Sequence, residues 1–515
     1  MTDGSDRHLL LRRKRHVTAE AGPRGTGKWT RRAALLAGGA VIGVAGARAW
    51  DAALPDDTAL ARLPDATPPG MLNDASLLSP TPVASHRTVT DAGEALADVI
   101  RTALAEREPI CVSAARHSMG GQSIPRNGNA ITYDNGSVEL DRAAGTYRVH
   151  AGARWRDVIA ALDPQGFSPK IMQSNHDFGV AATFCVNAHG WPAPFGPMGS
   201  SVRSLRMVVP SGELVSASRT ENADLFAQTM GGYGLTGAII DLEVEMEPNT
   251  RLEPSFEIMP ARAFAGAFRA ALDSGAVPMA YGRLDVARGS FLEEALLITY
   301  RQSADQADLP AAAGSGWVSK AGGALYRAQL GRDSMKSLRW FVETQVGPRV
   351  AGGATTRNAL INEPVATLDD GDPTRTDILH EYFVPFDRWD AYLDLCRDVI
   401  PASFQEFLNV TLRFVDTDAE SWLSYAAVPR IATVMSFSQE MSARAEADMA
   451  RMTRALIDGV LAIGGSYYLP YRPHATVQQF ARAYPRAAEF AAAKRRLDPG
   501  LRFRNNLWDS YLGAL

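Results

Sequence analysis

From about residue 88 onward, apolar and polar positions repeat with the periods of strands and helices in turn. Between residues 240 and 246 apolar residues alternate with acidic ones, which predicts a strand with one solvent-facing side. Further strands are expected at 109–114, 295–300, 377–385, 409–415 and 433–437, hairpins at 138–151 and 205–218, helices at 91–107, 155–162, 222–230, 260–272, 387–399 and 442–463, and a loop at 302–324. The mixture predicts an α+β protein.

The length of the chain implies more than one packed core. At 515 residues it exceeds the size at which a single hydrophobic core stops growing. The run Pro248-Asn249-Thr250 interrupts the pattern and places a boundary between two domains. The predicted organisation is a signal segment at 1–49, a linker at 50–87, a first domain at 88–248, a second domain at 249–470, and a segment at 471–515 that returns to the first domain.

The N-terminal segment has the layout of an export signal. A polar, basic stretch leads to Thr30-Arg31-Arg32, an apolar run covers residues 33–47, and Ala47-Arg48-Ala49 has the small-x-small pattern of a cleavage site. The layout resembles a twin-arginine signal and implies the twin-arginine export machinery as a partner and a periplasmic or membrane-associated location. An uncleaved membrane anchor and a chance juxtaposition are the alternatives.

Charge and cysteine usage exclude several classes of function. Residues 1–49 hold ten of the 53 Lys and Arg residues but three of the 57 Asp and Glu residues, so the remaining body is acidic. An acidic body is repelled by phosphate backbones, so nucleic acid is not expected as a partner. Cys111, Cys185 and Cys396 are widely spaced, which argues against a disulfide scaffold and a thiolate zinc site. No metal site is predicted.

One glycine motif has the wrong context for a dinucleotide site. Residues 232–237 fit the pattern GxGxxG, which in a Rossmann unit follows a strand and opens a helix. Here a predicted helix precedes the glycines and a predicted strand follows them. The glycines are therefore expected to form a tight turn where backbone segments pack closely.

Two loops of small residues are better candidates for holding phosphate. Residues 113–123, Ser-Ala-Ala-Arg-His-Ser-Met-Gly-Gly-Gln-Ser, follow a short apolar strand, and residues 179–190 form a second such stretch that ends in Asn187-Ala188-His189-Gly190. Successive backbone N–H groups in such loops can surround phosphate oxygens as a concave nest. Each loop alone is weak evidence, because loops of small residues are common.

Together with the segments that follow, these loops resemble the FAD-binding domain of the vanillyl-alcohol oxidase family. The family signature combines a histidine-containing loop, a segment ending in N-x-H-G, a strand-turn-strand, a helix like Glu221-Asn222-Ala223-Asp224-Leu225-Phe226, and Gly231-Gly232-Tyr233-Gly234. The resemblance spans residues 88–248. Thr411-Leu412-Arg413, Tyr471-Arg472-Pro473-His474 and Asn505-Asn506 are similar to the alditol oxidase and arabinonolactone oxidase branch.

The resemblance implies a PCMH-type FAD-binding domain of two subdomains, a substrate domain with an antiparallel sheet, and FAD as cofactor. Alanine pairs stand where the family has glycine pairs, which puts backbone approach in doubt if those positions need a positive φ. The implied FAD-binding residues are Ala114, Ala115, Arg116, His117, Ser118, Gly121, Gln122, Ser123, Gly179, Ala181, Ala182, Thr183, Asn187, His189, Gly190, Ile239 and Asn505.

The resemblance also implies individual roles. His117 matches the position that carries the flavin covalently in several relatives, and a non-covalent contact is the alternative. Arg413 is expected to be the cation near flavin N1, where negative charge develops. His474 and Tyr471 are candidates for contacting substrate or taking its hydroxyl proton, although a structural hydrogen bond is equally compatible. His189 is expected to order its loop.

Two further residues, Glu381 and Tyr382, are expected near the pocket. The leading hypothesis is an FAD-dependent oxidoreductase that oxidises a CH–OH group of a sugar-, polyol- or aldonolactone-like small molecule, with dioxygen or a membrane electron carrier as acceptor. Val477 stands where alditol oxidase has a lysine, so polyol specificity does not follow from the resemblance. The alternatives are a catalytically degenerate FAD-binding protein and an exported carbohydrate-binding protein without flavin.

Overall fold

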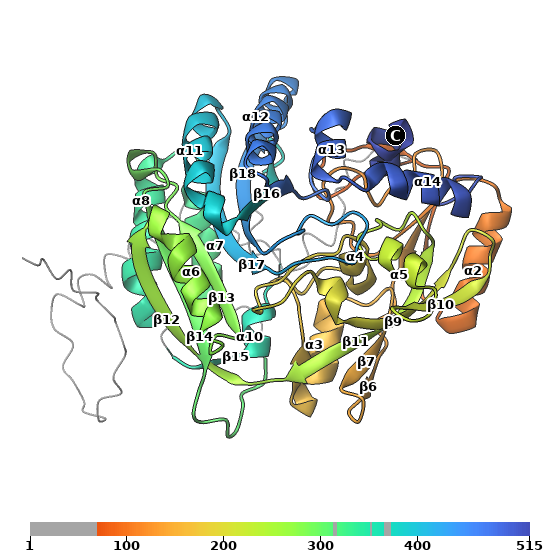
Figure 1. The fold of residues 1–515 in the computed structure, drawn as a ribbon, viewed down its shortest axis with the longest axis horizontal. Coiled ribbons are helices and arrows are strands. Elements are labelled where there is room, and N and C mark those ends of the chain that lie inside the picture. Colours follow the sequence, from red (N-terminus) through yellow and green to blue (C-terminus); the bar gives the residue numbers. More distant parts are fainter. Residues whose placement is uncertain (1–69, 313–316, 351–352, 365–371) are drawn as a thin grey trace, which may run out of the picture.

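The computed structural model describes residues 70–312, 317–350, 353–364 and 372–515. Sheets with helices packed on them form two halves, and the C-terminal helices lie across the top of the first half (Figure 1). The predicted signal segment 1–49 and most of the predicted linker lie outside the described residues. Among the described residues no helix is both long and apolar enough to cross a lipid bilayer.

The first half begins with a small parallel sheet. Strands β3 (Ser85–Val89), β5 (Asn129–Tyr133) and β4 (Ile110–Ser113) lie side by side in that order. Helix α2 (Gly93–Ala105) connects β3 to β4 and buries one apolar face, as its periodicity predicts. The cofactor-loop candidate at 113–123 therefore leaves the carboxyl end of a buried strand.

A six-stranded sheet completes the first half. Its strands are β6 (Val138–Asp141), β7 (Thr146–His150), β8 (Phe167–Pro169), β9 (Val202–Val208), β10 (Leu214–Ser218) and β11 (Ala238–Pro248). They run in the order β10-β9-β11-β7-β6, and β8 pairs with the end of β11. Helices α3 (Trp155–Leu162), α4 (Val180–Cys185) and α5 (Ala223–Thr229) connect them. The glycine turn at 231–237 lies between α5 and β11, as predicted.

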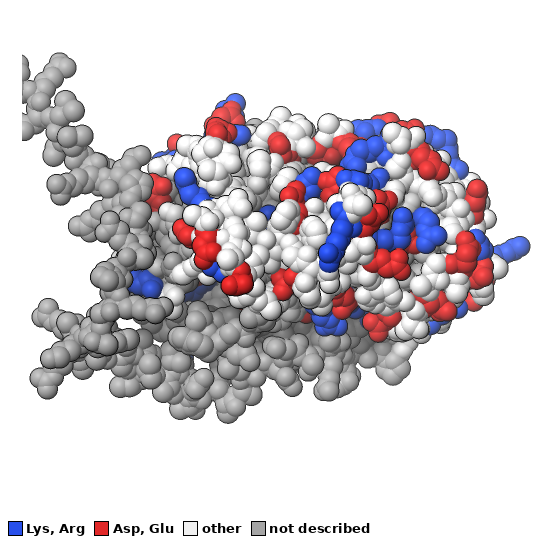
Figure 2. Space-filling model, turned by 90° about the horizontal axis from the view of Figure 1, so that it is seen from below, with Lys and Arg blue, Asp and Glu red and all other residues white. Residues whose placement is uncertain are grey.

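The face of β11 that carries the acidic residues is less exposed to solvent than the alternation predicted. Asp241 is buried because Arg148 of β7 and Arg206 of β9 both bind its carboxylate. Figure 2 shows acidic and basic side chains intermixed on the face seen from below, without a continuous band of either sign.

The second half is an eight-stranded, antiparallel sheet. It comprises β12 (Arg251–Pro260), β13 (Met279–Leu284), β14 (Glu294–Gln302), β15 (Thr355–Thr356), β16 (Arg375–Pro385), β17 (Glu406–Val415), β18 (Arg430–Glu440) and β19 (Ser466–Tyr467). The order is β15-β12-β14-β13-β17-β18-β16-β19. β16 and β18 pair along their full lengths, from Arg375 opposite Glu440 to Pro385 opposite Arg430. The chain passes from the first sheet to the second between β11 and β12.

Helices cover both faces of this sheet. One face packs on α6 (Phe264–Asp273), α11 (Trp389–Val399) and α12 (Ala443–Ala462), whose apolar residues form one core with the sheet. The other carries contacts to α7 (Trp317–Ala328) and α8 (Asp333–Phe341), followed by a π-helical turn (Val342–Val346), α9 (Gly347–Val350) and α10 (Arg357–Ile361). The predicted loop at 302–324 is therefore wrong from Trp317 onward, where a helix begins.

The C-terminal segment joins the two halves. Helices α13 (Val477–Ala483) and α14 (Ala487–Leu497) pack in the core of the second sheet, whereas Phe503 lies in the core of the first half. Phe503 forms a parallel bridge with Ile110, the first residue of β4, and α15 (Asn506–Ser510) follows. The contacts with β4 fit the predicted return to the first domain.

The prediction of a linker up to residue 87 is wrong for the described part from residue 70. Strands β1 (Met71–Leu72) and β2 (Thr81–Pro82) pair as a short hairpin, and Asp74 within it is fully buried. We call residues 70–83 the strap. Its Pro and Asp content suggested an open segment, but Asn73, Asp74 and Ser76 form hydrogen bonds within the strap, and Asp74 also accepts one from the Gly121 N–H.

Candidate active site

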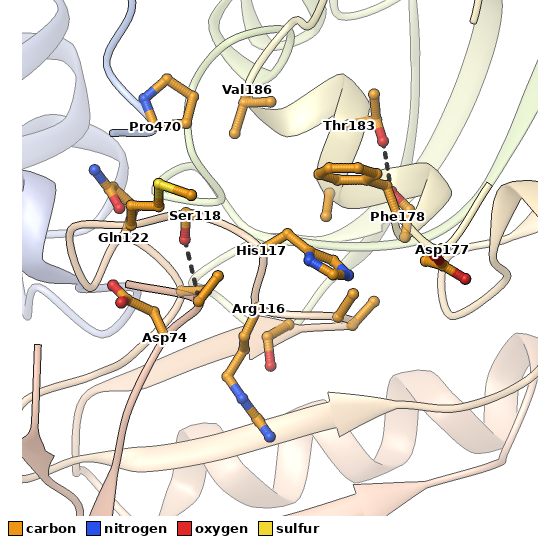
Figure 3. Close-up of a pocket in the computed structure, with 18 of the residues that line it drawn as sticks. Asp74, Arg116, His117, Ser118, Gln122, Asp177, Phe178, Thr183, Val186 and Pro470 are labelled. Carbon is orange, nitrogen blue, oxygen red and sulfur yellow. Dashed lines mark hydrogen bonds between the residues drawn. The ribbon is translucent and has the colours of Figure 1, made fainter. Parts of the chain in front are cut away.

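A cavity of about 1340 Å³ lies where the two halves and the strap meet. Its volume exceeds the roughly 300–1,000 Å³ of most small-molecule sites, so it can hold a large ligand. The first half contributes the loops at 113–123 and 177–189, and the second half contributes Glu381 on β16 and Arg413 on β17. Figure 3 shows the end of the cavity at which the two loops face the strap.

The first loop divides into a free part and an anchored part. The backbone N–H groups of residues 115–118 find no hydrogen-bond acceptor among the described residues. The next three N–H groups are held by Pro470 O, the Gln122 side chain and the Asp74 carboxylate, at 2.7, 2.8 and 2.6 Å. The anchored part therefore fixes a run of unpaired donors against the cavity.

The second loop lies directly against the first. A Cβ atom placed on Gly179 would come within 2.5 Å of the Ala114 Cβ, and the rings of His117 and Phe178 have centroids 4.5 Å apart (Figure 3). Gly179 precedes α4, and Thr183 in that helix donates a hydrogen bond to the Gly179 carbonyl at 2.7 Å. Two loops more than fifty residues apart therefore form one continuous wall.

The alanine pairs do not obstruct this wall. None of Ala114, Ala115, Ala181 and Ala182 has a positive φ, so their methyl groups cost no backbone strain. The left-handed conformation in the first loop belongs to Arg116, with φ of +52°. The doubt that the glycine-to-alanine differences raised is thus removed by the backbone itself.

Two partly buried cations flank the loops. Arg116 donates to Thr132 Oγ1 at 2.8 Å, and its Nε atom has no partner among the described residues. Arg154 similarly has an unpaired, buried Nη1 atom. Burial, and then their mutual repulsion, lower the pKa of Arg116, and burial lowers that of Arg154, but a guanidinium stays protonated at neutral pH. Unpaired N–H donors and cations together fit an anionic ligand such as a pyrophosphate.

His117 lies in this wall as a neutral ring. Burial, with a smaller contribution from Arg154, lowers its pKa to about 4. At neutral pH one ring nitrogen therefore keeps its lone pair. Figure 3 shows the imidazole pointing into the space between the two loops.

A second cluster of polar groups lies on the sheet side of the cavity. The Glu381 carboxylate accepts a hydrogen bond from the Tyr471 hydroxyl at 3.1 Å and is bonded to His189 Nε2. Glu381 and His189 are each only 4% exposed. Arg413 donates to Ser174 Oγ at 3.2 Å; burial lowers its pKa, an effect that Glu381 and Tyr471 oppose. A carboxylate, a phenol, an imidazole and a cation therefore line one cavity.

The structure brings most of the predicted site residues to this cavity. Those that line it are Ala114, Ala115, Arg116, His117, Ser118, Gln122, Ser123, Gly179, Ala181, Ala182, Thr183, His189, Ile239, Arg413 and Tyr471, and Glu381 joins them. Gln122 also donates to the carbonyls of Leu469 and Tyr471 at 2.7 and 2.9 Å. It thereby ties the first loop to the segment that carries Tyr471.

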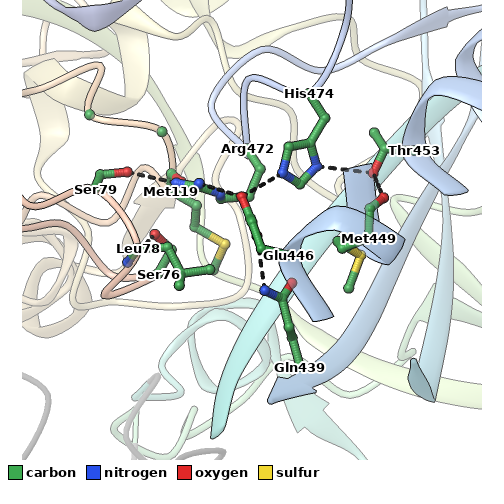
Figure 4. Close-up of polar contacts among 12 residues, drawn as sticks. Ser76, Leu78, Ser79, Met119, Gln439, Glu446, Met449, Thr453, Arg472 and His474 are labelled. Carbon is green, nitrogen blue, oxygen red and sulfur yellow. Dashed lines mark hydrogen bonds and ion pairs between the residues drawn. The ribbon is translucent and has the colours of Figure 1, made fainter. Parts of the chain in front are cut away.

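His474 does not line the cavity, and the expectation that it contacts substrate is corrected. Its Nε2 atom bonds Glu446 at 2.9 Å and its Nδ1 atom lies 3.2 Å from Thr453 Oγ1 (Figure 4). Glu446 also accepts from Arg472 at 2.6 Å and from Gln439 at 2.9 Å. This partly buried network fixes the 470–474 segment to α12, so His474 makes a structural hydrogen bond.

Five other predicted residues also lie off the cavity and have structural contacts. Asn505 caps α15 and donates to Tyr233 O at 2.8 Å. Asn187 bonds Ser421 Oγ at 2.7 Å and accepts from the Gly199 N–H. A Cβ on Gly190 would lie 2.2 Å from Met172 O. Gly121 supplies the N–H bound by Asp74, and Tyr382 is buried in the core of the second half.

Sequence reasoning missed several residues of the wall. Asp74 and its neighbours in the strap line the cavity, as do Arg154, Gln173 and Asn175. None of these residues belongs to a motif, and each lies in a segment that connects helices or strands. The one available signal was Arg154, which directly precedes a predicted helix in the half that holds the loops.

The fold and these loops define an FAD-binding protein. Residues 89–218 match the family model described as the FAD binding domain, and this stretch contains both loops. FAD is therefore the cofactor, and the unpaired donors and cations of the cavity wall fit it. The model covers the part of the first half from α2 to β10 and ends before α5 and β11.

Comparison with curated proteins gives relatives among oxidoreductases. The chain is 29% identical over 168 residues to an uncharacterized oxidoreductase in the fasciation locus of Rhodococcoides fascians, covering 32% of this chain and 37% of that one. It is 29% identical over 229 residues to cytokinin dehydrogenase 1 of Oryza sativa subsp. japonica, with 42% and 43% covered. Cytokinin dehydrogenase 5 of Arabidopsis thaliana is 30% identical over 164 residues, with 30% of each chain covered. The matches span roughly a third of the relatives' length.

Proposed function

We propose that this protein is an FAD-dependent oxidoreductase that oxidises a CH–OH group of a sugar-, polyol- or aldonolactone-like substrate. The observation that carries the proposal is the hydrogen-bonded pair of Glu381 and Tyr471 in the same cavity as the FAD-binding loops. When bound, FAD supplies an acceptor for the hydride that leaves the substrate carbon. The protein must then accept the hydroxyl proton and compensate the developing charge.

Glu381 is placed to accept that proton. Its carboxylate already receives a hydrogen bond from the Tyr471 hydroxyl, and His189 holds its other oxygen. A substrate hydroxyl that replaces or adds to the tyrosine donor would reach a buried base whose orientation is already fixed. Burial and Glu381 raise the pKa of Tyr471, so the phenol stays protonated and serves as a donor.

Arg413 supplies a fixed positive charge beside this pair. Arg413 is partly buried and lies within the field of Glu381 and Tyr471. A cation held in place before the reaction stabilises negative charge as that charge forms, without the cost of reorganising solvent. This supports the role near the flavin that the sequence resemblance implied.

The polarity of the cavity supports a hydroxylated substrate. Gln173 and Asn175 line it, and Gln173 Oε1 is buried without a partner among the described residues. An unpaired amide oxygen of this kind is satisfied by a ligand hydroxyl. The matches to cytokinin dehydrogenases cover too little of each chain to carry a substrate over.

Other parts of the proposal rest on the sequence. The unprotonated nitrogen of His117 is compatible with a covalent histidyl bond to the flavin and equally with a non-covalent contact. Dioxygen or a membrane electron carrier is the proposed final acceptor. Twin-arginine export to the periplasm is proposed from residues 1–49 alone.

Substitution of Glu381 by Gln tests the proposal. The purified yellow protein is mixed anaerobically with sugars, polyols and lactones, and flavin bleaching is followed in a stopped-flow spectrometer. With an active substrate, Glu381→Gln is expected to slow bleaching by about 10²–10⁴-fold, because the proton acceptor is lost while the shape is kept. The flavin content of the variant should match the wild type.

The control is Glu489→Gln, which removes an exposed carboxylate on α14 that pairs with Arg486. It should bleach at the wild-type rate. An equal rate in Glu381→Gln would assign the proton transfer to another group. A flavoprotein that no CH–OH donor bleaches would instead support the catalytically degenerate alternative, and a colourless folded protein would support the flavin-free one.

A further inference from the structure

The helical segment from Asp333 to Val350 has its polar and apolar residues on the unexpected sides. In α8, Lys336 and Arg339 are only 5% and 8% exposed, whereas Leu338 and Phe341 are 45% and 54% exposed. A surface helix of a soluble protein normally buries its apolar residues and exposes its charges. Specific contacts must therefore hold the two charged side chains inside, and the exposed apolar side chains indicate a surface that contacts something other than water.

The cause lies in the sheet beneath the helix. Lys336 Nζ is 3.2 Å from the Glu406 carboxylate at the start of β17. Arg339 donates to Leu408 O and to Asn409 Oδ1 on the same strand, and pairs with Glu343. These bonds fix the rotation of α8 about its axis. Leu338 and Phe341 are consequently held toward the outside.

The exposed apolar residues continue past α8. Val346 and Val350 are 38% and 57% exposed, and together with Leu338 and Phe341 they make up what we call the α8–α9 surface. Four exposed apolar residues within thirteen positions form a local concentration, whereas single exposed ones are ordinary.

The exposed charges of this segment are positive. Arg332 and Arg349, one at each end, are exposed. The two acidic residues are partly buried and already engaged, Asp333 with the Arg288 N–H at 2.7 Å and Glu343 with Arg339. Neither arginine has an ion-pair partner among the described residues, and an apolar strip between two such arginines is complementary to a surface with an apolar interior and an anionic boundary.

We propose that the α8–α9 surface docks on an anionic lipid bilayer. The apolar side chains would enter the boundary between headgroups and acyl chains, and the two arginines would meet lipid phosphates. Such docking needs no membrane-spanning helix. The preceding helix α7 packs on α8 and contributes Arg327 to the cavity wall, so the docked unit is continuous with the active-site cavity. This inference does not depend on the proposed substrate.

The test uses the full chain and vesicles of phosphatidylglycerol mixed with phosphatidylethanolamine. The double variant Leu338→Ser/Phe341→Ser is expected to bind these vesicles about tenfold more weakly than the wild type in a sedimentation assay. Val428→Ser is the control, because Val428 is 46% exposed but lies in the loop between β17 and β18. It should bind as the wild type does. The wild type and both variants all contain residues 1–49, so the basic charge of this segment does not affect the comparison between them.

Hydrogen–deuterium exchange locates the contact independently of the variants. Added vesicles should slow exchange in residues 333–350 of the wild type. Arg332→Gln/Arg349→Gln should lose the preference for phosphatidylglycerol over phosphatidylcholine vesicles. Equal binding by the double variant, or unchanged exchange in 333–350, would overturn the proposal. A concentration-dependent dimer that the double variant abolishes in light scattering would assign the surface to a second copy of the chain instead.

Discussion

At the scale of single residues, the FAD site depends on where methyl groups are placed. The two loops that resemble the family signature carry alanines in place of glycines, yet all four of those alanines adopt ordinary backbone angles. A methyl group added at Gly179 would meet the other loop, because the nearest atom there is the Ala114 Cβ. The contact between the loops is therefore made by Gly179 against Ala114, together with the rings of His117 and Phe178.

Gly179→Ala is expected to separate the two loops. Gly179 has φ of −70°, so alanine is allowed by the backbone and the clash with Ala114 is the whole effect. We expect a loss of about 1–3 kcal/mol in the free energy of unfolding and weaker FAD retention, measured by denaturant titration and flavin absorbance after gel filtration.

The double variant Ala114→Gly/Gly179→Ala should recover most of both losses, since it only exchanges the positions of glycine and alanine. Gly266→Ala is the control, because Gly266 lies in α6 with no atom within 4 Å of its added Cβ. It should be neutral or stabilising by up to about 1 kcal/mol. Additive losses in the double variant would show that the two loops are not coupled at this contact.

At the scale of elements, the strap holds the cofactor loop in place. Asp74 accepts from the Gly121 N–H at 2.6 Å, Ser76 O accepts from Thr376 Oγ1 at 2.7 Å, and Ser79 Oγ accepts from Arg472 at 2.7 Å. The strap thus bonds to the FAD loop, to β16 and to the segment that carries Tyr471. Three parts of the active site are connected by one short hairpin.

Asp74→Ala is expected to release this connection. The Gly121 N–H would lose its acceptor in a buried site, which costs about 1–3 kcal/mol. We expect a lower unfolding temperature and faster loss of FAD on dilution, followed by flavin fluorescence. Asp458→Ala, which removes an exposed carboxylate 3.8 Å from Arg482, should change neither. Unchanged FAD release in Asp74→Ala would show that the strap does not support the loop.

At the scale of the whole molecule, the active site exists only because the two halves face each other. The cofactor loops belong to the first half, the proton acceptor Glu381 and Arg413 belong to the second, and Tyr471 follows the second sheet. The bond between His189, in the first half, and Glu381, in the second, connects the two halves. Each half also contains a histidine whose pKa is lowered by burial, His117 in the first and His380 in the second.

Acid is expected to destabilise the folded protein through buried histidines. Burial lowers the pKa of His117 to about 4 and, with His474 as a smaller cause, that of His380 to about 3. Below about pH 6.5 the unfolded chain binds protons at these rings while the folded protein does not, so stability falls as the pH drops from 6.5 toward 4. Calorimetric unfolding temperatures across this range measure the effect.

His380→Gln should reduce the slope of the free energy of unfolding against pH by about 1.4 kcal/mol per pH unit between pH 6 and 4, because one fully buried titrating ring is removed. Its contacts with Thr453 and Tyr382 can be kept by the amide. An unchanged slope would mean that His380 is not neutral in the folded state.

Much of the fold followed from local pattern. The helices at 155–162 and 442–463 and the hairpins at 138–151 and 205–218 correspond to structured elements, because each buries one face whose periodicity is visible in the chain. The strap did not follow, since its polar and small residues carry no period and its conformation depends on partners such as Gly121 outside it. Helix α7 was missed because its Ala, Gly and Ser content was interpreted as a loop.

The candidate site likewise contains residues that the sequence identified and residues whose role only the structure shows. His117 and the two loops were found because small residues, successive donors and a histidine occur in a recognisable order. His474 and Asn505 lie in recognisable segments too, but their side chains bind Glu446 and Tyr233 and do not reach the cavity. A motif specifies residue types, whereas the direction of a side chain depends on the packing around it.

By itself, the sequence determined the α+β class, the order of the FAD-binding segments and the two loops, because these depend on local periodicity and on backbone groups that neighbouring residues supply. Only the tertiary structure decided which side chains share the cavity, that Asp74 belongs to it and that Leu338 and Phe341 face outward. Those outcomes depend on hydrogen bonds between residues hundreds of positions apart, or on the face that a strand presents to a helix, and such distances and orientations leave no trace in local composition.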